Sequence, residues 1–132
     1  MMDAWATQLV LNPWQFDMLL TTNLFGDILS DEMAGLVGGL GMTPGASIGE
    51  HAPIFEAVHG SAPDIAGQGI ANPTALLLAA ALMLEHVHKD DLAAVLRTAL
   101  TATLRQDGVP TRDLGGQATT RKFARAIVRR VG

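Results

Sequence analysis

The sequence has 132 residues, of which 48% are apolar and 17% charged, and it contains fourteen glycines, six prolines and no cysteine. This composition excludes intrinsic disorder, a disulfide scaffold and thiolate chemistry, and the length suits one domain or part of a larger one. Residues 1–88 carry nine acidic residues and no Lys or Arg, whereas residues 89–132 carry all nine basic residues and four acids. The first region therefore suits a divalent metal or the hydroxyl groups of a ligand. Because phosphate binding needs clustered cations, we expect no nucleic-acid partner.

The first third of the chain alternates helical and strand-like patterns. Met2–Leu11 is predicted to be a helix that Asn12 and Pro13 stop. Phe16–Thr22 is an apolar run too short for a helix, and it predicts a buried strand. Leu24–Val37 has helical spacing of apolar residues and ends at Gly38-Gly39.

Two loops rich in glycine flank a second predicted strand. Gly41–Pro53 reads as a loop with a short strand around Ala46–Ile48. Ile54–Val58 is the next strand candidate, and Gly60–Asn72 is the second glycine-rich loop.

The rest of the chain is predicted to be helical. Pro73 suits the start of an apolar helix over Thr74–His88, and Leu92–Leu104 follows as an amphipathic helix. Beyond a loop over Asp107–Gln117, Thr119 or Thr120 caps a final helix, Arg121–Val131.

The longest apolar stretch, Ala75–Leu84, has ten residues, half of the roughly 20 that a membrane span needs. The N-terminus lacks the basic and apolar regions of a secretory signal. We therefore expect a soluble, cytoplasmic chain with no membrane partner.

These elements predict an α/β fold that is helix-rich with few strands. Because two or three short strands make a poor sheet alone, the pattern indicates a piece of something larger.

Asp27 and Asp31 are the first candidate site. On a helix their spacing places both carboxylates on one face, with Cβ atoms about 6 Å apart. A hard divalent cation such as Mg²⁺ or Mn²⁺ relieves the resulting repulsion and accepts one or two carboxylates. The alternative is structural: Asp27 favours the first turn of the helix, and Asp31 simply faces water.

The segment His59–Pro73 is the second candidate, because its three glycines let a ligand approach backbone N–H groups. It lacks the G-x-G-x-x-G fingerprint, so an ordinary Rossmann fold is not expected. The alternative is that these residues only form a tight connection from a strand to a helix. His59 taken alone is more often a hydrogen-bonded structural histidine.

Together the motifs NLFGDILSDEMAGLVGGLG, PGASIG, FEAVHGSAPDIAGQGIANPTA and TTRKFARAI closely resemble the metal-dependent β-decarboxylating dehydrogenases. That family includes isocitrate, isopropylmalate, homoisocitrate and tartrate dehydrogenases. GLVGGLG with PGASIG is most similar to the NAD-dependent isocitrate branch. The resemblance covers nearly the whole chain and implies the C-terminal part of the isocitrate/isopropylmalate dehydrogenase fold.

The resemblance also implies roles for individual residues. Asp27 and Asp31 match the family's metal-binding carboxylates, and Asp3 matches a third acid that reaches the neighbouring subunit's metal site in the family dimer. Asp64 matches a position where a carboxylate accepts hydrogen bonds from the adenosine ribose and repels a 2′-phosphate, which favours NAD over NADP. The positions that match the NAD site are Glu56, His59, Gly60, Ser61, Ala62, Asp64 and Asn72.

The chain departs from the family in what it lacks. It corresponds to one C-terminal portion, residues 1–132, with a metal-site and dimerisation segment over 1–40 and the NAD loop and C-terminal helices over 41–132. It has no tyrosine, and Lys89 and Lys122 match no catalytic position. We therefore name no catalytic residue.

The implied activity is NAD- and Mg²⁺- or Mn²⁺-dependent oxidative decarboxylation of isocitrate, and we expect the chain alone not to turn over. Alternatives are a fragment of an isopropylmalate or homoisocitrate dehydrogenase, or a non-catalytic nucleotide-binding remnant. The expected partners are an isocitrate-like 2-hydroxy acid and either a second copy or a complementing N-terminal polypeptide.

Overall fold

A computed structural model describes residues 2–106 and 108–132. Among these residues the secondary structure is mostly helical, with one two-stranded sheet. The elements are α1 (Met2–Leu11), α2 (Asn23–Leu36), β1 (Pro44–Ser47), β2 (Ile54–Ala57), α3 (Thr74–His86), α4 (Asp90–Gln106) and α5 (Thr120–Val131). Asp107, the first residue of the predicted loop Asp107–Gln117, lies outside the described residues. No described helix is long and apolar enough to cross a bilayer.

The chain divides into two compact units, residues 1–39 and residues 40–132. The resemblance implies segments 1–40 and 41–132, so the observed boundary differs from the expected one by a single residue. The roles expected of the two segments remain predictions.

In the first unit α1 and α2 pack against each other. Leu9 and Leu29 are almost fully buried, and Trp5 stacks on Phe16 with ring centroids 5.1 Å apart. The end of α2 follows the sequence, because Gly38 has a positive φ and the Gly39 N–H donates to the Ala34 carbonyl at 2.7 Å.

The predicted strand over Phe16–Thr22 is wrong. After a 3-10 turn at Pro13–Gln15 this segment is irregular, and Leu20 is 96% exposed. No described strand lies beside it to supply a hydrogen-bonding partner. An apolar run alone does not make a strand without such a partner.

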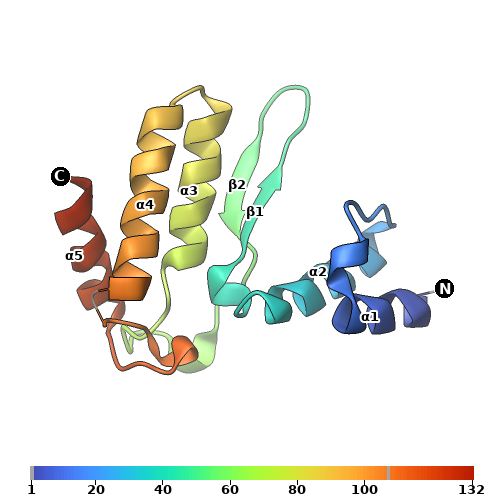
Figure 1. Ribbon diagram of the computed structural model, residues 1–132, viewed down its shortest axis with the longest axis horizontal. Helices are drawn as coiled ribbons and strands as arrows, with labels where there is room; N and C mark the ends of the chain where they lie inside the picture. The colour runs from blue at the N-terminus through green and yellow to red at the C-terminus, as the bar shows by residue number, and fades with distance from the viewer. Residues whose placement is uncertain (1, 107) are drawn as a thin grey trace. The chain divides into compact units, whose positions relative to one another are not determined.

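In the second unit α3 lies between the β1–β2 hairpin and α4, and α5 packs on the other side of α4 (Figure 1). The hairpin is antiparallel and pairs Gly45 with Glu56. The main core cluster joins Ala99 and Leu100 of α4 to Phe123 and Ile127 of α5.

The largely apolar sequence of α3 fits its position, because elements cover it on two sides. Its C-terminus has the paired bonds of a Schellman motif: the His88 N–H donates to Glu85 at 3.0 Å and the Lys89 N–H to Leu84 at 2.8 Å. His88 holds the left-handed conformation there, with φ of 57°. A bidentate ion pair between Arg97 and Glu85, at 2.8 and 3.2 Å, joins α4 to α3.

Candidate functional site

The two carboxylates of the predicted metal pair lie one turn apart on α2, and both are exposed. Neither forms an ion pair with a described residue. The Asp27 backbone carbonyl accepts a hydrogen bond from Ser30 Oγ at 3.0 Å. Both carboxylates are therefore available to a ligand, and two hard oxygen donors on one face fit Mg²⁺ or Mn²⁺.

Asp3 lies in the first turn of α1 and is exposed. No group of three acidic or histidine side chains that could hold a metal is found in the part of the chain described, so Asp3 does not complete a site with Asp27 and Asp31. Since Mg²⁺ commonly takes one or two carboxylates and completes its shell with substrate oxygens and water, the α2 pair fits part of such a site.

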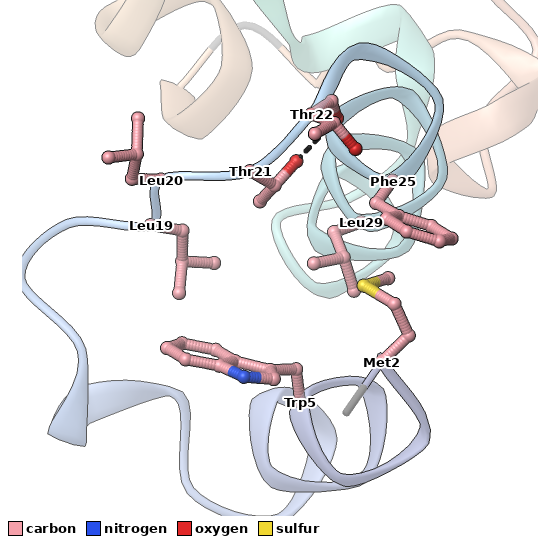
Figure 2. A pocket seen from close by; sticks show the side chains of 8 residues that line it. All are labelled: Met2, Trp5, Leu19, Leu20, Thr21, Thr22, Phe25 and Leu29. Carbon is pink, nitrogen blue, oxygen red and sulfur yellow. Dashed lines mark hydrogen bonds between the residues drawn. The ribbon is translucent and has the colours of Figure 1, made fainter.

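An apolar hollow of about 510 Å³ lies in the same unit (Figure 2). Leu19, Trp5 and Leu29 face it from the irregular segment, α1 and α2, respectively. Its other lining residues are Met2, Leu20, Thr21, Thr22 and Phe25. The pattern of the sequence did not predict this hollow, because it depends on the irregular path of residues 16–22.

The second candidate site begins on β2 and runs through the glycine-rich loop. Glu56 is exposed on the strand, and His59 follows it with Nδ1 3.0 Å from the Gly60 carbonyl oxygen. That nitrogen donates to the carbonyl when it carries the ring proton. Gly60 and Ser61 are exposed beside it.

Asp64 lies in a 3-10 turn, Pro63–Ile65, and its side chain is exposed. Ala62 precedes the turn with φ of 44°, a conformation that is uncommon for a residue with a Cβ and concentrates at functional sites. The Asp64 backbone carbonyl accepts from Gln68 Nε2 at 2.8 Å, whereas its carboxylate forms no ion pair among the described residues. The turn thus presents a carboxylate that a ligand can reach.

The second half of the loop has left-handed glycines at Gly67 and Gly69. The N–H groups of these two residues and of Ile70 and Ala71 donate to no acceptor among the described residues. Successive unpaired N–H groups in such a turn form a concavity that suits an anion.

Asn72 differs from the other predicted cofactor residues because it is buried, with 8% of its surface exposed. Its Oδ1 accepts from the Thr74 N–H at 3.0 Å, and its Nδ2 donates to Asp113 Oδ2 at 2.8 Å. The sequence did not single out Asp113, since a contact 41 residues away leaves no local signal.

Residues 1–127 match the family model for isocitrate/isopropylmalate dehydrogenase. The chain belongs to this family. This membership confirms the resemblance that the motifs indicated. The structure confirms the expected fold in that it is rich in helices and has few strands.

The crystal structure of isocitrate dehydrogenase from Methylococcus capsulatus superposes with a TM-score of 0.93 and 53% identity, over 98% of this chain and 39% of that one. The 3-isopropylmalate dehydrogenase of Methanothermobacter thermautotrophicus is 54% identical over 96% of this chain and 38% of its own length. The mitochondrial isocitrate dehydrogenase [NAD] subunit alpha of Sus scrofa is 52% identical over 98% of this chain and 36% of its own. The chain therefore spans less than two fifths of each relative.

Proposed function

We propose that this chain supplies the divalent-metal carboxylates and the NAD-binding loop of an enzyme that oxidises and decarboxylates a 2-hydroxy acid, with isocitrate giving 2-oxoglutarate. The observation that carries the proposal is the loop at Asp64, where an unpaired carboxylate lies a few residues before four free backbone N–H groups. A relative of 52% identity that is named for NAD supports the choice of cofactor.

In this proposal the loop recognises both polar parts of the cofactor. The Asp64 carboxylate accepts hydrogen bonds from the ribose hydroxyls and repels a 2′-phosphate, so NAD binds and NADP is disfavoured. The N–H groups of Gly67 and Gly69 donate toward phosphate oxygens. Glu56, His59, Gly60, Ser61 and Ala62 line the approach to this loop.

Asp27 and Asp31 would hold Mg²⁺ or Mn²⁺, and Asp3 would serve the metal site of a neighbouring subunit. When bound, the metal polarises an oxygen of the substrate and NAD accepts the hydride. The protein's part is to hold two carboxylates one helical turn apart and to keep them free of competing cations, since residues 1–88 contain no Lys or Arg.

The substrate proposal is isocitrate, because GLVGGLG and PGASIG are most similar to that branch. Isopropylmalate is the alternative, since an isopropylmalate dehydrogenase is as similar as the isocitrate enzymes. Homoisocitrate also stays open.

We further propose that the chain alone does not turn over and works with a second copy or a complementing polypeptide. It has no tyrosine, and its two lysines, Lys89 and Lys122, lie at the turn before α4 and on α5. The second candidate is a non-catalytic role in which the chain only binds a nucleotide. The absence of tyrosine from the sequence favours this role as well, because tyrosine is one of the residues that transfer protons in catalysis.

Calorimetric titration with NAD and with NADP, in the presence of Mn²⁺, tests the cofactor proposal. We expect saturable NAD binding that Asp64→Lys weakens by about tenfold or more, because hydrogen bonds to a charged group are lost. Glu50→Lys is the matched control, since Glu50 is exposed in the loop that joins β1 to β2. If a folded sample binds neither nucleotide, or if Asp64→Lys binds NAD as well as Glu50→Lys does, the cofactor proposal is wrong.

A further inference from the structure

The glycine-rich loop is tied to a segment that lies about 50 residues further along the chain. The Thr120 N–H donates to the Gly69 carbonyl at 2.8 Å, and Thr120 Oγ1 donates to the Ala71 carbonyl at 2.5 Å. One residue therefore holds two loop carbonyls, through its backbone and through its side chain.

Asp113 makes the third tie, to Asn72 at the end of the loop. With Nδ2 bonded to Asp113 and Oδ1 bonded to the Thr74 N–H, the Asn72 amide is oriented from both ends. Nδ2 also lies 3.5 Å from Met42 Sδ. The side chain thus joins three segments, and the cofactor-binding role expected of Asn72 stays a prediction.

Gly41 permits this junction to close. A Cβ at Gly41 would lie 3.2 Å from Asp113 Oδ2 and 3.3 Å from the Asn72 Cβ. Both separations are tighter than an ordinary contact, so a larger residue at this position would push the bonded pair. The close approach of the chain at Gly41 is part of the same arrangement.

These ties decide which backbone groups of the loop remain free. The Gly69 and Ala71 carbonyls are bound to Thr120, whereas the N–H groups of the same residues donate to nothing among the described residues. Because a carbonyl shares its peptide plane with the N–H of the next residue, binding the Gly69 and Ala71 carbonyls fixes where the N–H groups of Ile70 and Asn72 point. A loop ordered in advance also spares a ligand the entropic cost of ordering it.

We propose that Asp113 and Thr120 are positioning residues that hold residues 69–72 in the conformation that binds the cofactor, without contacting the cofactor themselves. This inference rests on the proposed function for its ligand. The hydrogen bonds from Thr120 and Asp113 to the loop do not depend on that function, and amide hydrogen exchange measures them separately from NAD binding.

The test uses Thr120→Val, Thr120→Ser and Asp113→Ala in the full chain. Thr120→Val removes the hydroxyl but keeps the shape, whereas Thr120→Ser keeps the hydroxyl. Thr119→Ala is the matched control, because the adjacent Thr119 caps α5 by accepting from the Lys122 N–H at 3.2 Å and makes no bond to the loop among the described residues. Each variant is titrated with NAD, and amide hydrogen exchange is followed at residues 74 and 120, whose N–H groups donate to Asn72 Oδ1 and to the Gly69 carbonyl, and at Phe123.

We expect Thr120→Val and Asp113→Ala to weaken NAD binding by about tenfold each. Exchange should accelerate at the N–H of residue 120 in Thr120→Val and at the Thr74 N–H in Asp113→Ala, without accelerating at Phe123. Thr120→Ser and Thr119→Ala should bind NAD like the unaltered chain. Equal NAD affinity in all variants, or loss of affinity in Thr119→Ala as large as in Thr120→Val, overturns the positioning role. If the unaltered chain binds no NAD, the proposed function fails. Faster exchange at residue 120 but not at Phe123 in Thr120→Val then still supports the tie, and unchanged exchange at residue 120 overturns it.

Discussion

In residues 40–132 the side chains of Leu100, Phe123 and Ile127 are enclosed in one cluster, whereas in residues 2–39 Trp14 and Leu20 are 92% and 96% exposed. The larger unit has helices that cover one another's apolar faces. The smaller unit buries Leu9 and Leu29 but leaves much of its apolar surface in solvent. The larger unit therefore encloses its apolar residues in a core more fully than the smaller unit does.

The largest test of this comparison is Phe123→Ala. Phe123 is fully buried between α4 and α5, and removing a buried aromatic ring costs about 3–5 kcal/mol. Both tryptophans, Trp5 and Trp14, belong to the smaller unit, so their fluorescence reports its unfolding. Far-UV circular dichroism follows α3, α4 and α5 for the most part.

We expect Phe123→Ala to lower the urea midpoint seen by circular dichroism and to leave the fluorescence midpoint in place. Leu20→Ala is the control, since an exposed side chain changes stability by no more than about 0.5 kcal/mol. Equal shifts of both probes in Phe123→Ala would mean that the two units unfold as one body.

Asp31→Asn sharpens the comparison by acting on the smaller unit alone. Without metal, removing the like charge one turn from Asp27 should raise the free energy of unfolding of this unit by about 0.2–0.5 kcal/mol. The urea midpoint seen by fluorescence should therefore rise slightly. With Mn²⁺ the order should reverse, because the unaltered chain gains binding energy that the variant lacks.

Asp17→Asn, which changes an exposed acid of the same unit outside α2, should respond to Mn²⁺ like the unaltered chain. If Mn²⁺ leaves the midpoint of the unaltered chain unchanged, the two carboxylates hold no metal in this chain.

The smallest expected effect concerns pH and the larger unit. The hydrogen bond and charge of Arg97 hold the pKa of Glu85 below its ordinary value of 4.5. A lowered pKa means that the folded state binds the proton less well than the unfolded state. The pair thus stabilises the fold above pH 4.5, and this contribution is lost as the pH falls through the lowered pKa.

Urea midpoints from circular dichroism, taken at decreasing pH, should fall more steeply for the unaltered chain than for Glu85→Gln. Glu50→Gln, in the exposed hairpin loop, is the matched control. Parallel curves for the chain and Glu85→Gln would show that the pair adds nothing measurable to stability, as is common for exposed pairs.

The helices could be predicted from the sequence because their signals are local. α1 has the predicted bounds, and α2 begins and ends within one residue of the predicted range. Thr119, one of two candidates for the α5 cap, is the residue that caps it. Periodicity and end signals act over a few residues, so a single sequence contains them.

The features that could not be predicted depend on partners distant in the chain. The run at Phe16–Thr22 has strand composition but no strand to pair with. The hydrogen bond by which Asp113, 41 residues away, orients the Asn72 side chain leaves no local signal in the sequence, and the cofactor-binding role of Asn72 stays a prediction. Asp27, Asp31 and Asp64 were found as candidates through their residue type and motif, and the structure adds that all three are exposed.

The ties from Thr120 to Gly69 and Ala71 also bear on the order in which the chain becomes structured during synthesis. Protein chains emerge from the ribosome N-terminus first, and contacts distant in sequence must wait for the later partner. Helix α3 can form soon after residue 86 is made, but the loop before it has only its local hydrogen bonds until Asp113 and Thr120 have been added. A nascent chain should therefore be able to form α3 before it acquires a shaped loop, and a nucleotide present during translation would meet a formed site only after residue 120 has been added.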